Sequence, residues 1–209
     1  MSDCPIYLPW QIPPDLDTGD VLFTHGPDWK SRVVRWWTRH RGEAKSVADH
    51  QQIIYSPLKT LSYTLANGPT WFTIPEYWAG MKRRNDEWII FRRVTPPTER
   101  QKAVCMDKME RSWLTWKYSK PELGLQGLDN LLEKIAGRRI IFFRKLGRLW
   151  KDGVVCSTGS NIILKALGWL PPSSRYFSPD DTIDFMLAHP DQWRPIARSI
   201  AWTQFTGKG

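Results

Sequence analysis

The sequence lacks any run of about 18 apolar residues, so it predicts no transmembrane helix. Its N-terminal segment also lacks a basic stretch followed by an apolar one, and it carries prolines and acids instead. We therefore expect no signal peptide and a protein that is cytoplasmic as synthesised. A cytoplasmic enzyme fits this pattern, and so does a phage-associated enzyme or one delivered to the cell envelope by another route.

Cysteine is scarce, with Cys4, Cys105 and Cys156 far apart in 209 residues. An odd number of cysteines at wide spacing argues against a disulfide framework. The absence of a CxxC pair argues against a structural zinc site. We accordingly expect neither a metal nor another cofactor.

Tryptophan and positive charge, by contrast, are abundant. Thirteen Trp in a chain that is 41% hydrophobic indicate a packed core, because a soluble monomer rarely exposes so much aromatic surface. The net charge of +9 favours an anionic partner, such as nucleic acid, an anionic membrane or the polymers of a cell envelope. The basic residues form short scattered clusters typical of solvated surface, so we expect no specific nucleic acid.

Strand patterns come first in the sequence and helix patterns later, which favours an α+β fold with a small antiparallel sheet packed against helices. Short apolar runs bounded by turn residues predict strands at 21–24, 47–55, 60–66 and 87–94. Helical spacing and capping residues predict helices at 29–41, 98–116, 129–136, 156–167 and from 178 onward. The helix at 29–41 is amphipathic, with its apolar stripe facing either the core or a membrane surface.

The domain organisation follows from composition. Residues 1–17 are rich in proline and predict an extended arm, and residues 18–209 predict a single domain. Within that domain, 119–152 is expected to be an insertion or lid, and 170–209 a C-terminal extension.

Two residues have a sequence context that suits catalysis. Cys156 stands at the start of an expected helix, whose dipole stabilises a thiolate. His50 begins an expected strand, and an imidazole next to a thiol activates it. His25 fits a catalytic role less well, because we expect it in a loop after the first strand. A cysteine at a helix start is often only a small buried residue, and a histidine beside Asp49 can be structural.

Seven short elements occur in the order typical of a known family. They are Gly19-Asp20-Val21-Leu22-Phe23, Arg32 to Trp37, Asp49-His50, Tyr63 to Gly68, Trp88 to Arg92, Lys117-Tyr118 and Val155-Cys156-Ser157. Over residues 18–168 the chain resembles the circularly permuted NlpC-like hydrolases of papain fold, the YiiX-like group. The resemblance implies a permuted papain-like fold with the cysteine at the N-terminus of a late helix.

The resemblance also implies an activity. Cys156 would be the nucleophile and His50 the general base of a cysteine hydrolase, an amidase or endopeptidase. The substrate it suggests is a peptide or acyl-amide, such as a peptidoglycan peptide of the anionic cell envelope. A lipid thioesterase or acyltransferase uses the same chemistry.

The chain departs from the family at the third catalytic position. The expected second strand carries no acid to orient the imidazole, so Tyr63 is the expected helper, with Thr64 and Gln52 as alternatives. This departure leaves open a non-catalytic binding or structural module that keeps the fold. For substrate binding, the expected residues are Tyr118, Ser157 and Gln52.

Overall fold

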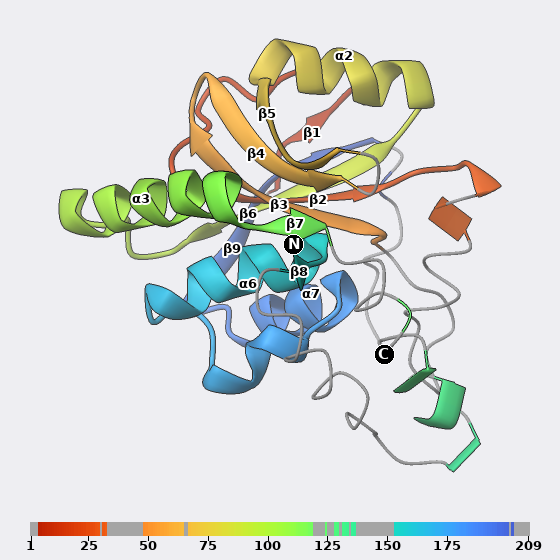
Figure 1. Cartoon of the computed structure of the whole chain (residues 1–209). Coiled ribbons are helices and arrows are strands. Elements are labelled where there is room, and N and C mark those ends of the chain that lie inside the picture. Colours follow the sequence, from red (N-terminus) through yellow and green to blue (C-terminus); the bar gives the residue numbers. More distant parts are fainter. Residues whose placement is uncertain are drawn as a thin grey trace.

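The computed structural model describes residues 4–29, 31–32, 48–64, 67–118, 124, 128–129, 131–133, 135–136, 153–200 and 202. Its centre is a seven-stranded sheet in the order β1-β9-β6-β2-β3-β4-β5 (Figure 1). Neighbouring strands are antiparallel except β1 and β9, which run parallel. The α+β class is confirmed, but the sheet is larger than expected and mixed rather than purely antiparallel.

The elements have the following bounds. The sheet contains β1 (Ile6–Tyr7), β2 (Val21–His25), β3 (His50–Ser56), β4 (Lys59–Thr64), β5 (Gly68–Thr73), β6 (Glu87–Arg93) and β9 (Trp193–Ser199). A separate parallel pair contains β7 (Lys117–Tyr118) and β8 (Gly153–Val154). The helices are α2 (Ile74–Arg84), α3 (Glu99–Thr115), α6 (Cys156–Ala166), the 3-10 helix η2 (Pro172–Tyr176) and α7 (Pro179–Ala188).

The terminal segments complete the sheet, which the sequence analysis did not foresee. β9 lies between β1 and β6, so residues 170–209 are not merely an extension, and the N-terminal arm contributes an edge strand. β1 has only two residues, and β9 contains Pro195, which pairs with Phe91 at a register shift. Proline within a strand is tolerated at such irregularities but removes the usual strand pattern from the sequence.

Side chains alternate between the two faces of the sheet and build two separate cores. Phe23 and Ile53 pack in a cluster with residues of α3, α6 and α7, and we call this side the α6 face. Leu22 and Ile54 pack with Trp78 of α2 in a second cluster, on the α2 face. Figure 1 shows α2 on one side of the sheet and α6 and α7 on the other.

Capping residues explain where the helices begin. Thr98 forms a capping box with Gln101 at the start of α3, and Ser178 forms one with Asp181 at the start of α7, as their sequence patterns predict. Thr73 forms another with Glu76 at the start of α2. Side-chain oxygens thus satisfy N–H groups that the first helical turn leaves unpaired.

The Gly19-Asp20 pair has a structural role at the start of β2. Gly19 has φ of +91°, and a Cβ there would lie 2.8 Å from the ring of Trp169, so only glycine fits. The carboxylate of Asp20 accepts two hydrogen bonds from the guanidinium of Arg92, each of 2.7 Å. This bidentate pair joins the start of β2 to β6.

Three of the expected segments lie largely or partly outside the described residues. The expected helix at 29–41 and the insertion or lid at 119–152 fall largely outside the described residues, and the expected helix at 129–136 does so in part. Among the helices that the structure does describe, none has the length and apolar character needed to cross a membrane.

Candidate functional site

Cys156 is the first residue of α6, as the sequence predicted. Its side chain is 8% exposed, and the preceding residue, Val155, makes no side-chain cap. The side chain of the N-cap residue therefore does not compete with Cys156 for the N–H groups of the first helical turn. The backbone N–H groups of Gln51, Ser157 and Cys156 itself lie close to the sulfur and favour its thiolate form.

The buried position of this thiol opposes ionisation. Burial raises the pKa of Cys156 to about 11, and the nearby charge of Asp49 raises it further, while the three backbone N–H groups lower it. Desolvation is the largest of these effects, so the free thiol is protonated at neutral pH. A reaction at Cys156 therefore requires a group that removes its proton.

The predicted partner, His50, does not supply that group in this geometry. Its imidazole lies on the α2 face with Gln52 and Ile54, whereas Cys156 packs on the α6 face. No hydrogen bond joins the two side chains in the part of the chain that the structure describes. Successive residues of a strand point to opposite faces, and the register of β3 turns position 50 away from α6. The expected Cys156–His50 pair is thus not assembled.

The environment of His50 is that of a structural histidine. Its Nε2 lies 2.8 Å from Oγ of Ser62 in β4. Burial, and after it the positive charge of Arg84, lower the pKa of His50 to about 4. The imidazole is therefore neutral at physiological pH.

Two polar side chains adjoin the imidazole: Ser62, which the sequence did not suggest, and Gln52, one of the three expected helpers, whose side chain favours the charged imidazole. Tyr63 lies on the α6 face, where its hydroxyl is 2.7 Å from Oγ of Ser112. Thr64 donates to the carbonyl of Gly68 in the following turn. The alternation of side chains along the two strands could have indicated Ser62. Positions 62 and 50 share a face of the sheet when Ile53 pairs with Leu61.

The expected substrate-binding residues are dispersed. Ser157 adjoins Cys156 and is almost wholly buried. Its backbone N–H group lowers the pKa of the Cys156 thiol. Gln52 is buried on the α2 face and lies away from α6. Tyr118 pairs through its backbone with Val154, two residues before Cys156, and its side chain lies outside the described residues.

A polar network that the sequence did not reveal holds α6 against the sheet. Gln51 donates to Oδ1 of Asn161 at 2.8 Å, and Asn161 donates to Oγ1 of Thr182 in α7 at 3.1 Å. Oδ1 of Asp180 accepts the N–H of Ala48 at 2.9 Å, just before β3. These contacts join the start of β3 to the middle of α6 and the first turn of α7.

His25 also belongs to this region. It is the last residue of β2, and not part of a loop as the sequence suggested. It follows Val21 and Phe23 on the α6 face, and its ring stands edge-on to that of Trp202 at 6.2 Å. Among the residues that the structure describes, no group of three or more His, Cys, Asp and Glu side chains could hold a metal ion.

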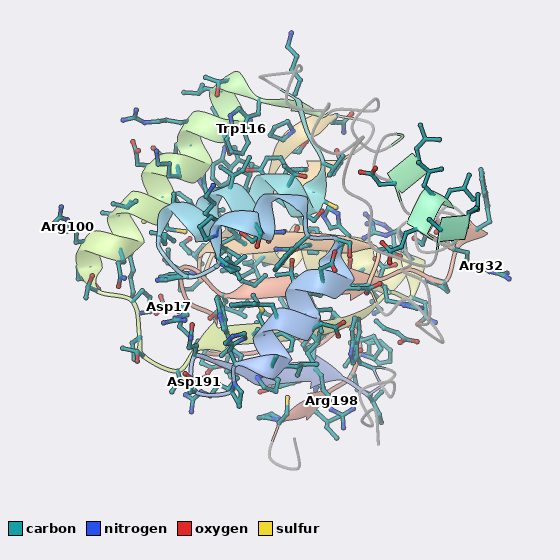
Figure 2. All side chains as sticks on the ribbon, turned by 90° about the horizontal axis from the view of Figure 1, so that it is seen from below. Asp17, Arg32, Arg100, Trp116, Asp191 and Arg198 are labelled. Carbon is teal, nitrogen blue, oxygen red and sulfur yellow. The ribbon has the colours of Figure 1, made fainter. Side chains whose placement is uncertain are left out.

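Another aromatic contact at this site involves Tyr63. Its ring stacks on that of Trp116, with centroids 6.1 Å apart and planes inclined by 30°. Figure 2 labels Trp116 at the end of α3. Tyr63 and Trp116 therefore pack between α3 and α6, beside the first turns of α6.

No family model matches this sequence, and no curated protein matches it. Among solved structures, the fold is similar to that of the metalloprotein YiiX from Escherichia coli O157:H7, DUF1105, with a TM-score of 0.45 and 11% sequence identity. The similarity covers 72% of this chain and 66% of the YiiX chain, just under two thirds of that protein.

Proposed function

We propose that this chain is a cysteine hydrolase of permuted papain-like, NlpC-like architecture that cleaves an amide or ester bond through Cys156. The observation that carries the proposal is the position of the thiol at the N-terminus of α6, where the backbone N–H groups of Gln51, Ser157 and Cys156 favour its thiolate form. The same N–H groups and helix dipole suit the negative charge that develops when a thiolate attacks a carbonyl.

The proposed substrate class is a peptide or acyl-amide of an anionic surface, such as a peptidoglycan peptide. The net charge of +9 supports this choice, because a basic protein is attracted to anionic polymers. A phage-associated or delivered enzyme would meet such a substrate. A lipid thioester or acyl chain would fit the same thiol chemistry.

A second candidate is a non-catalytic module that retains the fold. The position of His50 on the α2 face and the raised pKa of Cys156 favour it. In that case Cys156 is a small buried residue that packs between α6 and the sheet.

Thiol labelling separates the two candidates, because the chain contains two internal controls. Burial raises the pKa of Cys105 to about 12 and also raises that of Cys4. If Cys156 is the nucleophile, we expect iodoacetamide to modify it about tenfold faster than either control at neutral pH, because a general base then removes the proton that burial otherwise retains. Mass spectrometry of the labelled peptides measures the three rates.

Hydrolysis of p-nitrophenyl acetate tests turnover. The wild type should release p-nitrophenolate and Cys156→Ser should not, whereas Cys105→Ser should retain the activity. Equally slow labelling of all three thiols, without ester hydrolysis, would refute the enzyme and leave the non-catalytic module.

A further inference from the structure

The thiol of Cys156 needs a proton acceptor on the α6 face, and the fold places an imidazole there. From its position, we infer that His25 is the general base that serves Cys156. This inference rests on the proposed cysteine hydrolase and assigns a residue to it that the resemblance did not suggest.

The sheet register brings the two residues together. The sulfur of Cys156 lies against the N–H of Gln51, and Gln51 pairs with Phe23 in the adjacent strand β2. His25 follows Phe23 by two residues and therefore shares its face. Strands lie about 4.8 Å apart and each residue advances about 3.3 Å, so the Cα of His25 is on the order of 8 Å from the backbone beside the sulfur. An imidazole side chain spans much of that distance.

The packing around His25 also points to the thiol. Trp202 contacts its ring edge-on and belongs to the same core cluster as Cys156. This tryptophan therefore supports one side of the imidazole and limits its rotation within the α6 face. His50, in contrast, is enclosed on the α2 face by Ser62 and Arg84.

Two acidic residues, Asp49 and Glu87, lie beside His25 or its neighbour Gly26, and a third, Asp180, anchors the chain next to Asp49. Oδ2 of Asp49 accepts the N–H of Gly26, the residue after His25, at 2.8 Å. Glu87 of β6 pairs directly with His25 across the sheet, and Asp180 at the start of α7 holds Ala48 next to Asp49. Carboxylates on either side would stabilise the imidazolium that forms when His25 takes a proton.

Cys156 and His25 can together carry every proton transfer and bond change of the hydrolysis. His25 removes the proton of Cys156, and the sulfur forms a bond to the substrate carbonyl carbon while the C–N bond breaks. The imidazolium returns its proton to the leaving amine, which leaves an acyl thioester. Water then gives a proton to His25 and its oxygen to the acyl carbon, and the released sulfur recovers that proton.

The test compares His25→Ala, His50→Ala and His189→Ala in the full-length chain. His189 is bonded to the carbonyl of Phe185 at the end of α7 and serves as the control for loss of an imidazole. We expect His25→Ala alone to slow p-nitrophenyl acetate hydrolysis about 100-fold at neutral pH, the usual size of a general-base effect. Its iodoacetamide labelling of Cys156 should also shift to higher pH, and added imidazole should restore part of the hydrolysis.

The outcomes distinguish the two proposals. If His50→Ala removes the activity and His25→Ala does not, His25 is excluded while the hydrolase stands. If His25→Ala is slow but neither the pH profile nor added imidazole responds, with unchanged thermal unfolding, its role as a base is refuted. If wild-type Cys156 is inert towards both reagents, the hydrolase itself fails and His25 loses its role with it.

Discussion

At the residue scale, Asp20 illustrates a buried charge that depends on one partner. Its side chain is 2% exposed, and Arg92 approaches it with two nitrogens. Burial raises the pKa of Asp20 despite this partner, which shows how costly the isolated carboxylate is at this position.

Asp20→Asn should therefore destabilise the fold by about 3 kcal/mol, because Arg92 keeps its charge and loses its main acceptor. Urea unfolding monitored by tryptophan fluorescence measures the change. Asp107→Asn is the matched control, since its ion pair with Arg111 is largely exposed and should contribute less than about 1 kcal/mol. Equal effects of the two substitutions would contradict the assigned role of Asp20.

At the scale of elements, α6 approaches β4 closely enough to require glycine at position 159. A Cβ on Gly159 would lie 2.8 Å from ring atoms of Tyr63. That ring cannot move easily, because it stacks on Trp116 and its hydroxyl contacts Ser112. The tyrosine expected to assist catalysis instead sets the distance between this helix and the sheet.

Gly159→Ala should destabilise the protein by about 1–3 kcal/mol, the usual cost of overpacking a core. Gly80→Ala in α2 is the control, because its Cβ would meet the far ends of two flexible side chains, those of Arg84 at 3.3 Å and Arg83 at 4.0 Å. That control should be neutral or slightly stabilising, since alanine favours a helix interior over glycine. Denaturant midpoints measure both, and a stable Gly159→Ala protein would show that α6 does not pack on Tyr63 as described.

At the scale of the whole molecule, His50 couples stability to pH. Its pKa falls from an ordinary 6.5 to about 4 in the folded state, because burial and then Arg84 disfavour the charged imidazole. Between these two values the unfolded chain binds a proton that the folded chain does not. Stability is therefore complete above the unfolded value and decreases as the pH falls towards the folded one.

The expected loss from this group is up to about 3 kcal/mol between pH 7 and pH 4. Urea unfolding across that range measures it, and His50→Gln should show a shallower dependence, because its side chain does not titrate. Parallel pH dependences in the two proteins would contradict the assignment. The same variant should retain Cys156 labelling, since position 50 faces α2.

Local patterns account for much that the sequence predicted. The start of α6 at Cys156 follows from small residues after a short apolar run, and the starts of α3 and α7 follow from Thr98 and Ser178 as caps. Each depends on interactions within a few residues, which the sequence displays directly. The sequence did not predict β1 and β9, because these strands pair across opposite ends of the chain and not within a few residues.

Local sequence patterns are enough to predict the α+β class, the main helix starts and the position of Cys156 at the head of α6. The tertiary structure decided which histidine shares a face with that cysteine, because a strand alternates its side chains and one residue of register moves an imidazole to the other side of the sheet. It placed His50 beside Ser62 on the α2 face and His25 on the face of Cys156. The sequence shows that both histidines lie near expected strands. Only the pairing of β2 with β3 shows that they lie on opposite faces of the sheet.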